Sequence, residues 1–191
     1  MIWTVPNILT LLRIILIPVL VLVFYFSGQW SYQLSAIVFG VAALTDWFDG
    51  YLARRLKQIS VFGAFLDPVA DKLMVAVALV LLVQDNPSLL FVIPAAIIIG
   101  REIAISALRE WMSELGERTK VAVSIIGKIK TITQMVAILL LLYKVPLGPL
   151  PTHDIGLVLL YVAATLTLWS MIVYMKAAWP ILSGHSGVDS G

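Results

Sequence analysis

Three observations predict an all-α integral membrane protein, built as a bundle of six transmembrane helices. First, 61% of the 191 residues are hydrophobic and only 13% are charged, whereas soluble domains are about half apolar and a quarter charged. Second, six apolar stretches approach the roughly 20 residues that a helix needs to cross a bilayer. Third, turn-forming residues separate these stretches. Helices are expected because lipid offers no partner to a free backbone N–H or C=O.

The first stretch is expected to be a retained span rather than a cleaved leader, because no basic segment precedes it and Arg13 interrupts its apolar run. The second and third should form a hairpin around a short basic turn. We expect residues 1–180 to form a single membrane domain and residues 181–191 a short disordered tail. The six expected spans are about 7–26, 33–53, 63–84, 88–110, 121–143 and 154–176.

The distribution of basic residues predicts the orientation, because cytoplasmic loops carry the excess of Lys and Arg. Lys144 is the one basic residue expected on the outer side. The basic residues expected on the cytoplasmic side are Arg54, Arg55, Lys57, Arg109, Arg118, Lys120 and Lys176. Both termini should therefore face the cytoplasm. The absence of cysteine excludes disulfides and zinc–thiolate sites, and a net charge of +2 gives no reason to expect a nucleic-acid partner.

Four aspartates gather where the second and third spans approach the expected cytoplasmic boundary. Asp46 and Asp49 are three residues apart, and Asp67 and Asp71 are four apart, so each pair shares one helix face. The hairpin should bring both pairs to one depth. Ionised side chains within a membrane are costly and usually functional, so we expect a polar active site on the cytoplasmic side of the bundle.

Two arrangements would relieve the repulsion among these carboxylates. They could be partly protonated, as in a proton relay, or they could bind hard divalent cations, which prefer oxygen-only ligand sets. Two adjacent ions would balance the four charges, and paired metals recur in phosphoryl chemistry. Alternatively, one or two aspartates simply pair with Arg54 or Lys72.

Small residues near the aspartates would let a flat or phosphorylated ligand approach the backbone. These are Gly50, Ala53 and Gly63, although small residues also serve close helix packing in membranes. Arg54 could hold a phosphate with two hydrogen bonds, or extend its charged end to the membrane surface.

One face of the first span is polar, because Asn7, Thr10 and Arg13 recur every three residues. Arg13 lies about two turns into the membrane, which requires a polar or anionic partner within the bundle. For Asn7 and Thr10, capping of the helix start is an equal alternative.

The pattern Asp46-x₂-Asp49-Gly50-x₂-Ala53-Arg54-x₈-Gly63-x₃-Asp67-x₃-Asp71 resembles the signature of the CDP-alcohol phosphotransferases. The resemblance implies two divalent cations, Mg²⁺ or Mn²⁺, and a homodimer. The implied metal ligands are Asp46, Asp49, Asp67 and Asp71, with Asp71 also the general base. The residues implied to bind the CDP-diacylglycerol donor are Asn7, Thr10, Arg13, Gly50, Ala53, Arg54 and Gly63.

A second group of charges lies on the fourth and fifth spans, near the same membrane face, and indicates an acceptor that carries its own phosphate. The candidates are Arg101, Arg109, Lys128 and Lys130, with Glu102 orienting an arginine or adding a ligand. The alternative, anchoring by basic side chains that reach the membrane surface, suffices for Arg118 and Lys120. The segments GREI-x₄-LR and GKIKT are similar to those of the family branch that uses sn-glycerol 3-phosphate.

Members of that branch transfer a phosphatidyl group from CDP-diacylglycerol and release CMP. The resemblance therefore implies a protein of the bacterial inner membrane, in contact with membrane lipid. Inositol phosphate, serine or phosphatidylglycerol remain alternative acceptors. A cation transporter is a further alternative, but the acidic residues gather at one end and the outer halves of the spans offer no matching polar path.

Overall fold

The computed structural model describes residues 5–26, 28–56, 61–114, 125–146 and 148–182, and every long element among them is an α-helix. A single 3₁₀ turn, η1 (Gly28–Trp30), precedes the second helix. The helices are α1 (Val5–Phe26), α2 (Ser31–Leu56), α3 (Val61–Asp85), α4 (Leu89–Glu114), α5 (Ile125–Tyr143) and α6 (Thr152–Leu182). Each expected span therefore corresponds to a helix, and the all-α prediction is confirmed.

Three helices extend past the expected ends of their spans. Helix α2 continues to Leu56 instead of 53, α4 to Glu114 instead of 110 and α6 to Leu182 instead of 176. Residues 121–124 of the fifth expected span lie outside the described part of the chain. Pro18, Pro68 and Pro94 sit inside α1, α3 and α4. Membrane helices tolerate such residues because neighbouring helices and local adjustments satisfy the freed backbone groups.

Within the described residues, three helices are long and apolar enough to cross a membrane. Their apolar segments are Asn7–Phe26, Leu89–Met112 and Thr152–Lys176, and α5 adds the shorter apolar segment Ile129–Tyr143. Helices α2 and α3 carry the aspartates, and this charge lowers their hydropathy. The composition thus supports an integral membrane protein, while the crossing of the bilayer by all six helices stays a prediction.

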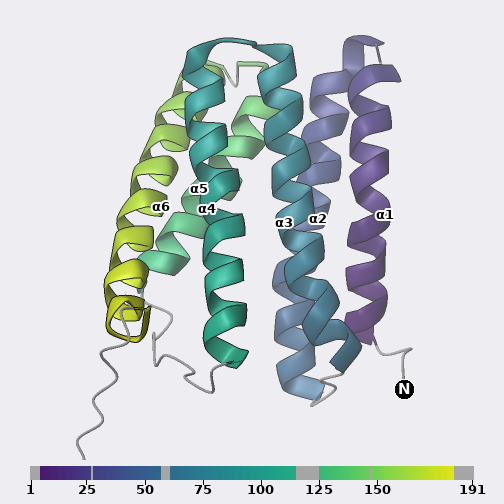
Figure 1. The fold of residues 1–191 in the computed structure, drawn as a ribbon. Helices are drawn as coiled ribbons and strands as arrows, with labels where there is room; N and C mark the ends of the chain where they lie inside the picture. Colours follow the sequence, from purple (N-terminus) through teal and green to yellow (C-terminus); the bar gives the residue numbers. More distant parts are fainter. Residues whose placement is uncertain (1–4, 27, 57–60, 115–124, 147, 183–191) are drawn as a thin grey trace, which may run out of the picture.

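The six helices run up and down side by side, with α1, α2 and α3 toward one side of the bundle and α4, α5 and α6 toward the other (Figure 1). Helix α1 packs against both α2 and α3, whereas α2 and α3 touch each other less. Helix α5 packs along α6 and also reaches α2, so it joins the two halves.

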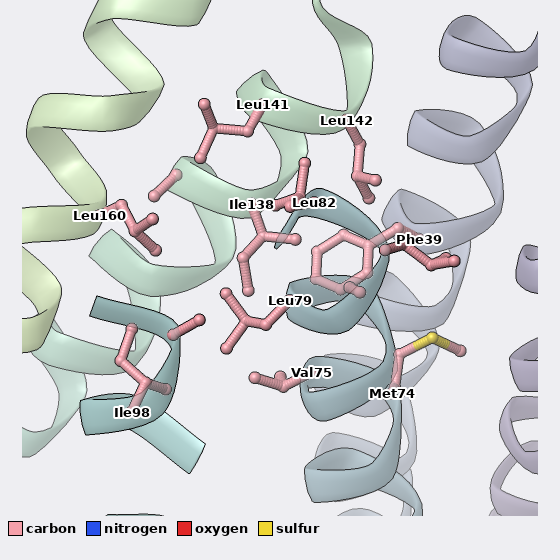
Figure 2. Packing of buried hydrophobic residues seen from close by; sticks show 14 of the residues in the cluster. Phe39, Met74, Val75, Leu79, Leu82, Ile98, Ile138, Leu141, Leu142 and Leu160 are labelled. Atoms are coloured by element: carbon pink, nitrogen blue, oxygen red, sulfur yellow. The ribbon is translucent and has the colours of Figure 1, made fainter. Parts of the chain in front are cut away.

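The apolar core fills the centre of the bundle and contains side chains from all six helices; Figure 2 shows part of it. Phe39, Leu79, Ile98, Ile138 and Leu160 come from α2 to α6 in turn, and all are buried. The buried charged side chains lie closer to the end of the bundle where α1, α3 and α5 begin. The core therefore holds the helices together above a polar region at one end.

At the opposite end of the bundle, a polar cluster links α2, α3 and the segment that follows α5. Lys144, just after α5, pairs with Asp85 at the end of α3 through a 2.8 Å contact. The hydroxyl of Tyr32, at the start of α2, donates to Asp85 at 3.2 Å and accepts from Lys144 Nζ at 3.2 Å. These contacts hold α2, α3 and α5 together at the end of the bundle opposite Asp46 and Asp67.

Candidate active site

The polar face of α1 is buried against the aspartates. Arg13 is 1% exposed, and its Nη1 lies 3.0 Å from Oδ1 of Asp46 on α2. The hydroxyl of Thr10, which is fully buried, donates a hydrogen bond to Oδ1 of Asp67 on α3. Asn7 is buried on the same helix. The expected anionic partner of Arg13 is therefore Asp46, and α1 contacts one aspartate of each pair.

The capping alternative for the first helix does not describe Asn7 or Thr10. Helix α1 begins at Val5, so both residues lie inside the helix and neither occupies the position that precedes its first turn. Thr10 uses its hydroxyl to contact α3 instead. The polar face of α1 is thus part of the interior of the bundle.

The two aspartates of α3, Asp67 and Asp71, have different neighbours. Asp67 meets Thr10 of α1, whereas Asp71, one turn later, lines a small space beside Arg13 and also a larger cavity shared with α4 and α5. Lys72 turns to α4, where its Nζ donates to Ser106 Oγ. Lys72 therefore has a partner other than an aspartate, contrary to the simplest charge-pairing alternative.

Several predicted donor-site residues are only partly described. Gly63 is buried in the first turn of α3. The last turns of α2 are helical, but the side-chain surroundings of Asp49, Gly50, Ala53 and Arg54 lie outside the described part of the structure. Their roles stay predictions.

The described side chains near Asp46 and Asp67 offer oxygen donors for a metal, chiefly carboxylates, and no histidine or cysteine. This donor chemistry fits Mg²⁺ or Mn²⁺ and does not fit zinc. Among the side chains that the structure describes, no three acidic or histidine groups already stand together as a ligand set. Asp46 is 42% exposed and pairs with Arg13, so a cation there would have to share Asp46 with the guanidinium.

A second charged cluster centres on Glu102 of α4. Its Oε1 lies 3.0 Å from Arg101 Nη1 and also accepts a hydrogen bond from Lys130 Nζ of α5. Arg101 and Lys130 are 8% and 5% exposed, and burial of such cations requires a paired negative charge. Glu102 thus orients both cations, as the sequence suggested for an arginine. The side chain of Lys128 lies outside the described residues.

Helix α6 completes the cationic cluster with two residues that the sequence analysis did not single out. Ser170 Oγ accepts a hydrogen bond of 2.9 Å from Arg101 Nη2, and the Tyr174 hydroxyl accepts one of 2.8 Å from Arg109 Nη2. The Tyr174 ring also lies 5.7 Å from the Arg101 guanidinium and 5.0 Å from that of Arg109. The sequence signal that could have identified Ser170 and Tyr174 is their four-residue spacing, which places both side chains on one face of α6.

A cavity of about 80 Å³ lies between Asp71 and the cationic cluster. It lies between α3, α4 and α5, and its polar lining residues are Asp71, Lys72, Glu102, Lys130, Thr131 and Gln134. A carboxylate on one wall and ammonium groups on another could hold a small molecule that carries both a hydroxyl and an anionic group. This is the chemistry expected where an alcohol acceptor meets a base.

Comparison with known proteins decides the family. The family model described as CDP-alcohol phosphatidyltransferase matches residues 3–169. The chain belongs to the CDP-alcohol phosphatidyltransferase family. The match includes every residue that the sequence analysis assigned to the donor, metal and acceptor sites, and it confirms the resemblance.

Relatives of this CDP-alcohol phosphatidyltransferase cover nearly the whole chain. A protein of Salmonella choleraesuis is 54% identical over 176 residues, which is 92% of this chain and 95% of the relative. One of Shigella flexneri is 55% identical over the same shares, and one of Yersinia pestis is 54% identical over 178 residues, 92% and 94% of the two chains. All three bear the name CDP-diacylglycerol–glycerol-3-phosphate 3-phosphatidyltransferase.

Proposed function

We propose that the chain transfers a phosphatidyl group from CDP-diacylglycerol to sn-glycerol 3-phosphate, giving phosphatidylglycerophosphate and CMP. The observation that carries this proposal is the cavity in which Asp71 faces the side of the bundle held by Glu102 and Lys130. The relatives named for the same reaction support it through their extensive identity.

The donor would bind at the aspartate end of α2 and α3. Asp46, Asp49, Asp67 and Asp71 would hold divalent cations, for which we propose two ions of Mg²⁺ or Mn²⁺. When bound, such ions polarise the donor phosphorus and stabilise the leaving CMP. The residues proposed to frame the cytidine diphosphate are Asn7, Thr10, Arg13, Gly50, Ala53, Arg54 and Gly63. Thr10 and Arg13 support this arrangement by holding Asp67 and Asp46.

Asp71 is proposed as the general base. An alcohol is a weak nucleophile, so a carboxylate within hydrogen-bond reach must take its proton as it attacks. The acceptor oxygen forms a bond to the phosphatidyl phosphorus, the bond from that phosphorus to the CMP oxygen breaks, and the hydroxyl proton passes to Asp71. The described site gives no reason to invoke a covalent enzyme intermediate.

The acceptor phosphate would bind to Arg101, Arg109, Lys128 and Lys130. Glu102 holds Arg101 and Lys130 in place, and Tyr174 holds Arg109 beside them. Arg101 and Lys130 are buried and hydrogen-bonded, and such cations suit a phosphate dianion, since charge-assisted hydrogen bonds are roughly twice as strong as neutral ones. An acceptor without a phosphate, such as serine, would offer this cluster only the single negative charge of its carboxylate.

We further propose that the protein crosses a bacterial inner membrane six times as a homodimer, with both termini and the site facing the cytoplasm. The distribution of Lys and Arg among the connections supports this orientation, and the relatives come from bacteria.

An acceptor panel tests the proposal. Purified protein in detergent micelles would receive radiolabelled CDP-diacylglycerol, Mn²⁺ or Mg²⁺, and one of sn-glycerol 3-phosphate, inositol phosphate, serine or phosphatidylglycerol. We expect CMP and labelled phosphatidylglycerophosphate in equal amounts with glycerol phosphate, and their loss when a chelator removes the metal. CMP release with serine but not glycerol phosphate would reject the acceptor, and cation flux in liposomes without CMP would reject the enzyme.

A further inference from the structure

A buried glutamine on α5 has a polar atom for which the described residues provide no partner. Gln134 is 5% exposed, and its Oε1 makes no hydrogen bond within the described part of the chain. Buried side-chain oxygens are satisfied in most proteins, so an unsatisfied one calls for a specific explanation. A ligand that is present during function is one such explanation.

The environment of Gln134 indicates what that ligand would be. The side chain lines the same cavity of about 80 Å³ as Asp71, Glu102 and Lys130. These groups provide a proton acceptor and a cation, and the glutamine adds a neutral group that both accepts and donates hydrogen bonds. A small hydroxylated anion matches this combination better than an apolar molecule or a bare inorganic ion.

The spacing between Lys130 and Gln134 along α5 would let one ligand place its phosphate beside Lys130 and its hydroxyl groups beside Gln134. Gln134 follows Lys130 by four residues, so the two side chains share a helix face about 6 Å apart along the axis. A three-carbon phosphate ester is of similar length. If Lys130 binds the phosphate, the hydroxyl-bearing carbons come to lie beside Gln134 and Asp71.

We propose that Gln134 is a specificity-determining residue that binds the secondary hydroxyl of the acceptor while Asp71 receives the proton of its primary hydroxyl. This assignment rests on the proposed function. It predicts that the enzyme selects acceptors with a hydroxyl on the carbon next to the reacting one, since a site built to pair a hydroxyl discriminates strongly against an analogue that lacks it.

Two acceptors separate this role from general binding. sn-Glycerol 3-phosphate and 3-hydroxypropyl phosphate share the phosphate and the primary hydroxyl, and only the first has the secondary hydroxyl. For the unaltered protein we expect kcat/KM to favour glycerol phosphate by about 10- to 100-fold. In Gln134→Met, which keeps the size but loses the amide, the preference should fall to within about threefold of unity, mainly through slower use of glycerol phosphate.

Gln134→Glu provides a conservative rescue. It keeps an acceptor oxygen, so the preference for glycerol phosphate should persist, while the added negative charge lowers kcat/KM for both phosphates. Gln33→Met is the matched control, because Gln33 Oε1 is also buried without a described partner, but it lies at the start of α2, at the other end of the bundle. This variant should keep the full preference.

The outcomes are distinct. An unchanged preference in Gln134→Met, a preference near unity in the unaltered protein, or an equal loss in Gln33→Met would overturn the role of Gln134 and leave the proposed function intact. If Gln134→Met does not fold, loss of the preference in Gln134→Glu would also overturn it. Absence of turnover with either phosphate in the unaltered protein would instead reject the proposed function.

Discussion

Tyr174 offers the sharpest test of the acceptor-phosphate site, because it touches two of the proposed phosphate ligands. Tyr174→Phe removes the 2.8 Å hydrogen bond from Arg109 and keeps the ring. A buried hydrogen bond to a charged group contributes about 1.5–3 kcal/mol, but an exposed arginine gains less, so we take about 0.5–1.5 kcal/mol here, and the acceptor KM should rise about 2- to 13-fold. Arg109 is exposed, which favours the lower part of that range.

Tyr174→Leu goes further, because it also removes the ring that lies 5.7 Å and 5.0 Å from the Arg101 and Arg109 guanidinium groups. Each cation–π contact at such a site contributes roughly 0.5–1 kcal/mol. The summed loss of about 1.5–3.5 kcal/mol corresponds to a rise of about 10- to 400-fold in acceptor KM. The donor KM should change little, since Tyr174 makes no described contact with Asp46, Asp67 or Asp71.

The assay is the initial rate of CMP release, with acceptor and donor concentrations varied separately. Tyr161→Phe and Tyr161→Leu are the matched controls, because Tyr161 is another tyrosine on α6 and lines an apolar surface groove away from the cations. Equal increases in donor and acceptor KM for the Tyr174 variants would refute the reasoning. So would an effect in the Tyr161 series of the same size.

Three further predictions concern the base, the metal and the opposite end of the bundle. Asp71→Asn should abolish turnover while sparing donor binding, and retention of normal rates would exclude the base role. Asp46→Ala should weaken Mn²⁺ binding measured by calorimetry at least tenfold, and unchanged affinity would contradict its role as a ligand. Burial lowers the pKa of Lys144, but its bonds to Asp85 and Tyr32 outweigh this and raise the pKa above 10.5. Lys144→Met should therefore cost about 0.2–1 kcal/mol of stability below pH 10.5, and the difference in Tm should close above it; a gap independent of pH would contradict this.

The helices and the need for an internal partner at Arg13 could be predicted from the sequence, because both follow from the spacing and depth of residues within one span. That the partner is Asp46 could not, since it depends on α1 packing against α2 and α3 together. A hairpin of adjacent spans predicts only that α2 and α3 are neighbours.

The cationic cluster, too, could be predicted from the sequence only in part. Its charges were visible in the sequence, and Glu102 was correctly expected to orient an arginine. The burial of Lys130 against Glu102 depends on the rotation of α5 relative to α4, which single-helix geometry does not define. Ser170 and Tyr174 escaped notice because an isolated serine and tyrosine in an apolar helix resemble ordinary membrane-facing residues. Gln134 was missed because only the three-dimensional structure shows that its side chain lines the cavity beside Asp71.

The contact between Arg13 and Asp46 has a consequence for how the chain enters the bilayer. When the ribosome has delivered only the first helix, its arginine has no carboxylate nearby. An arginine at the centre of a lone span costs about 2.5 kcal/mol or more to insert, and Arg13, about two turns into the membrane, carries a part of that cost. The neutralising group arrives with the following helix. The two segments should therefore leave the translocon as a pair, and loss of that carboxylate would impair membrane integration before any effect on catalysis could appear.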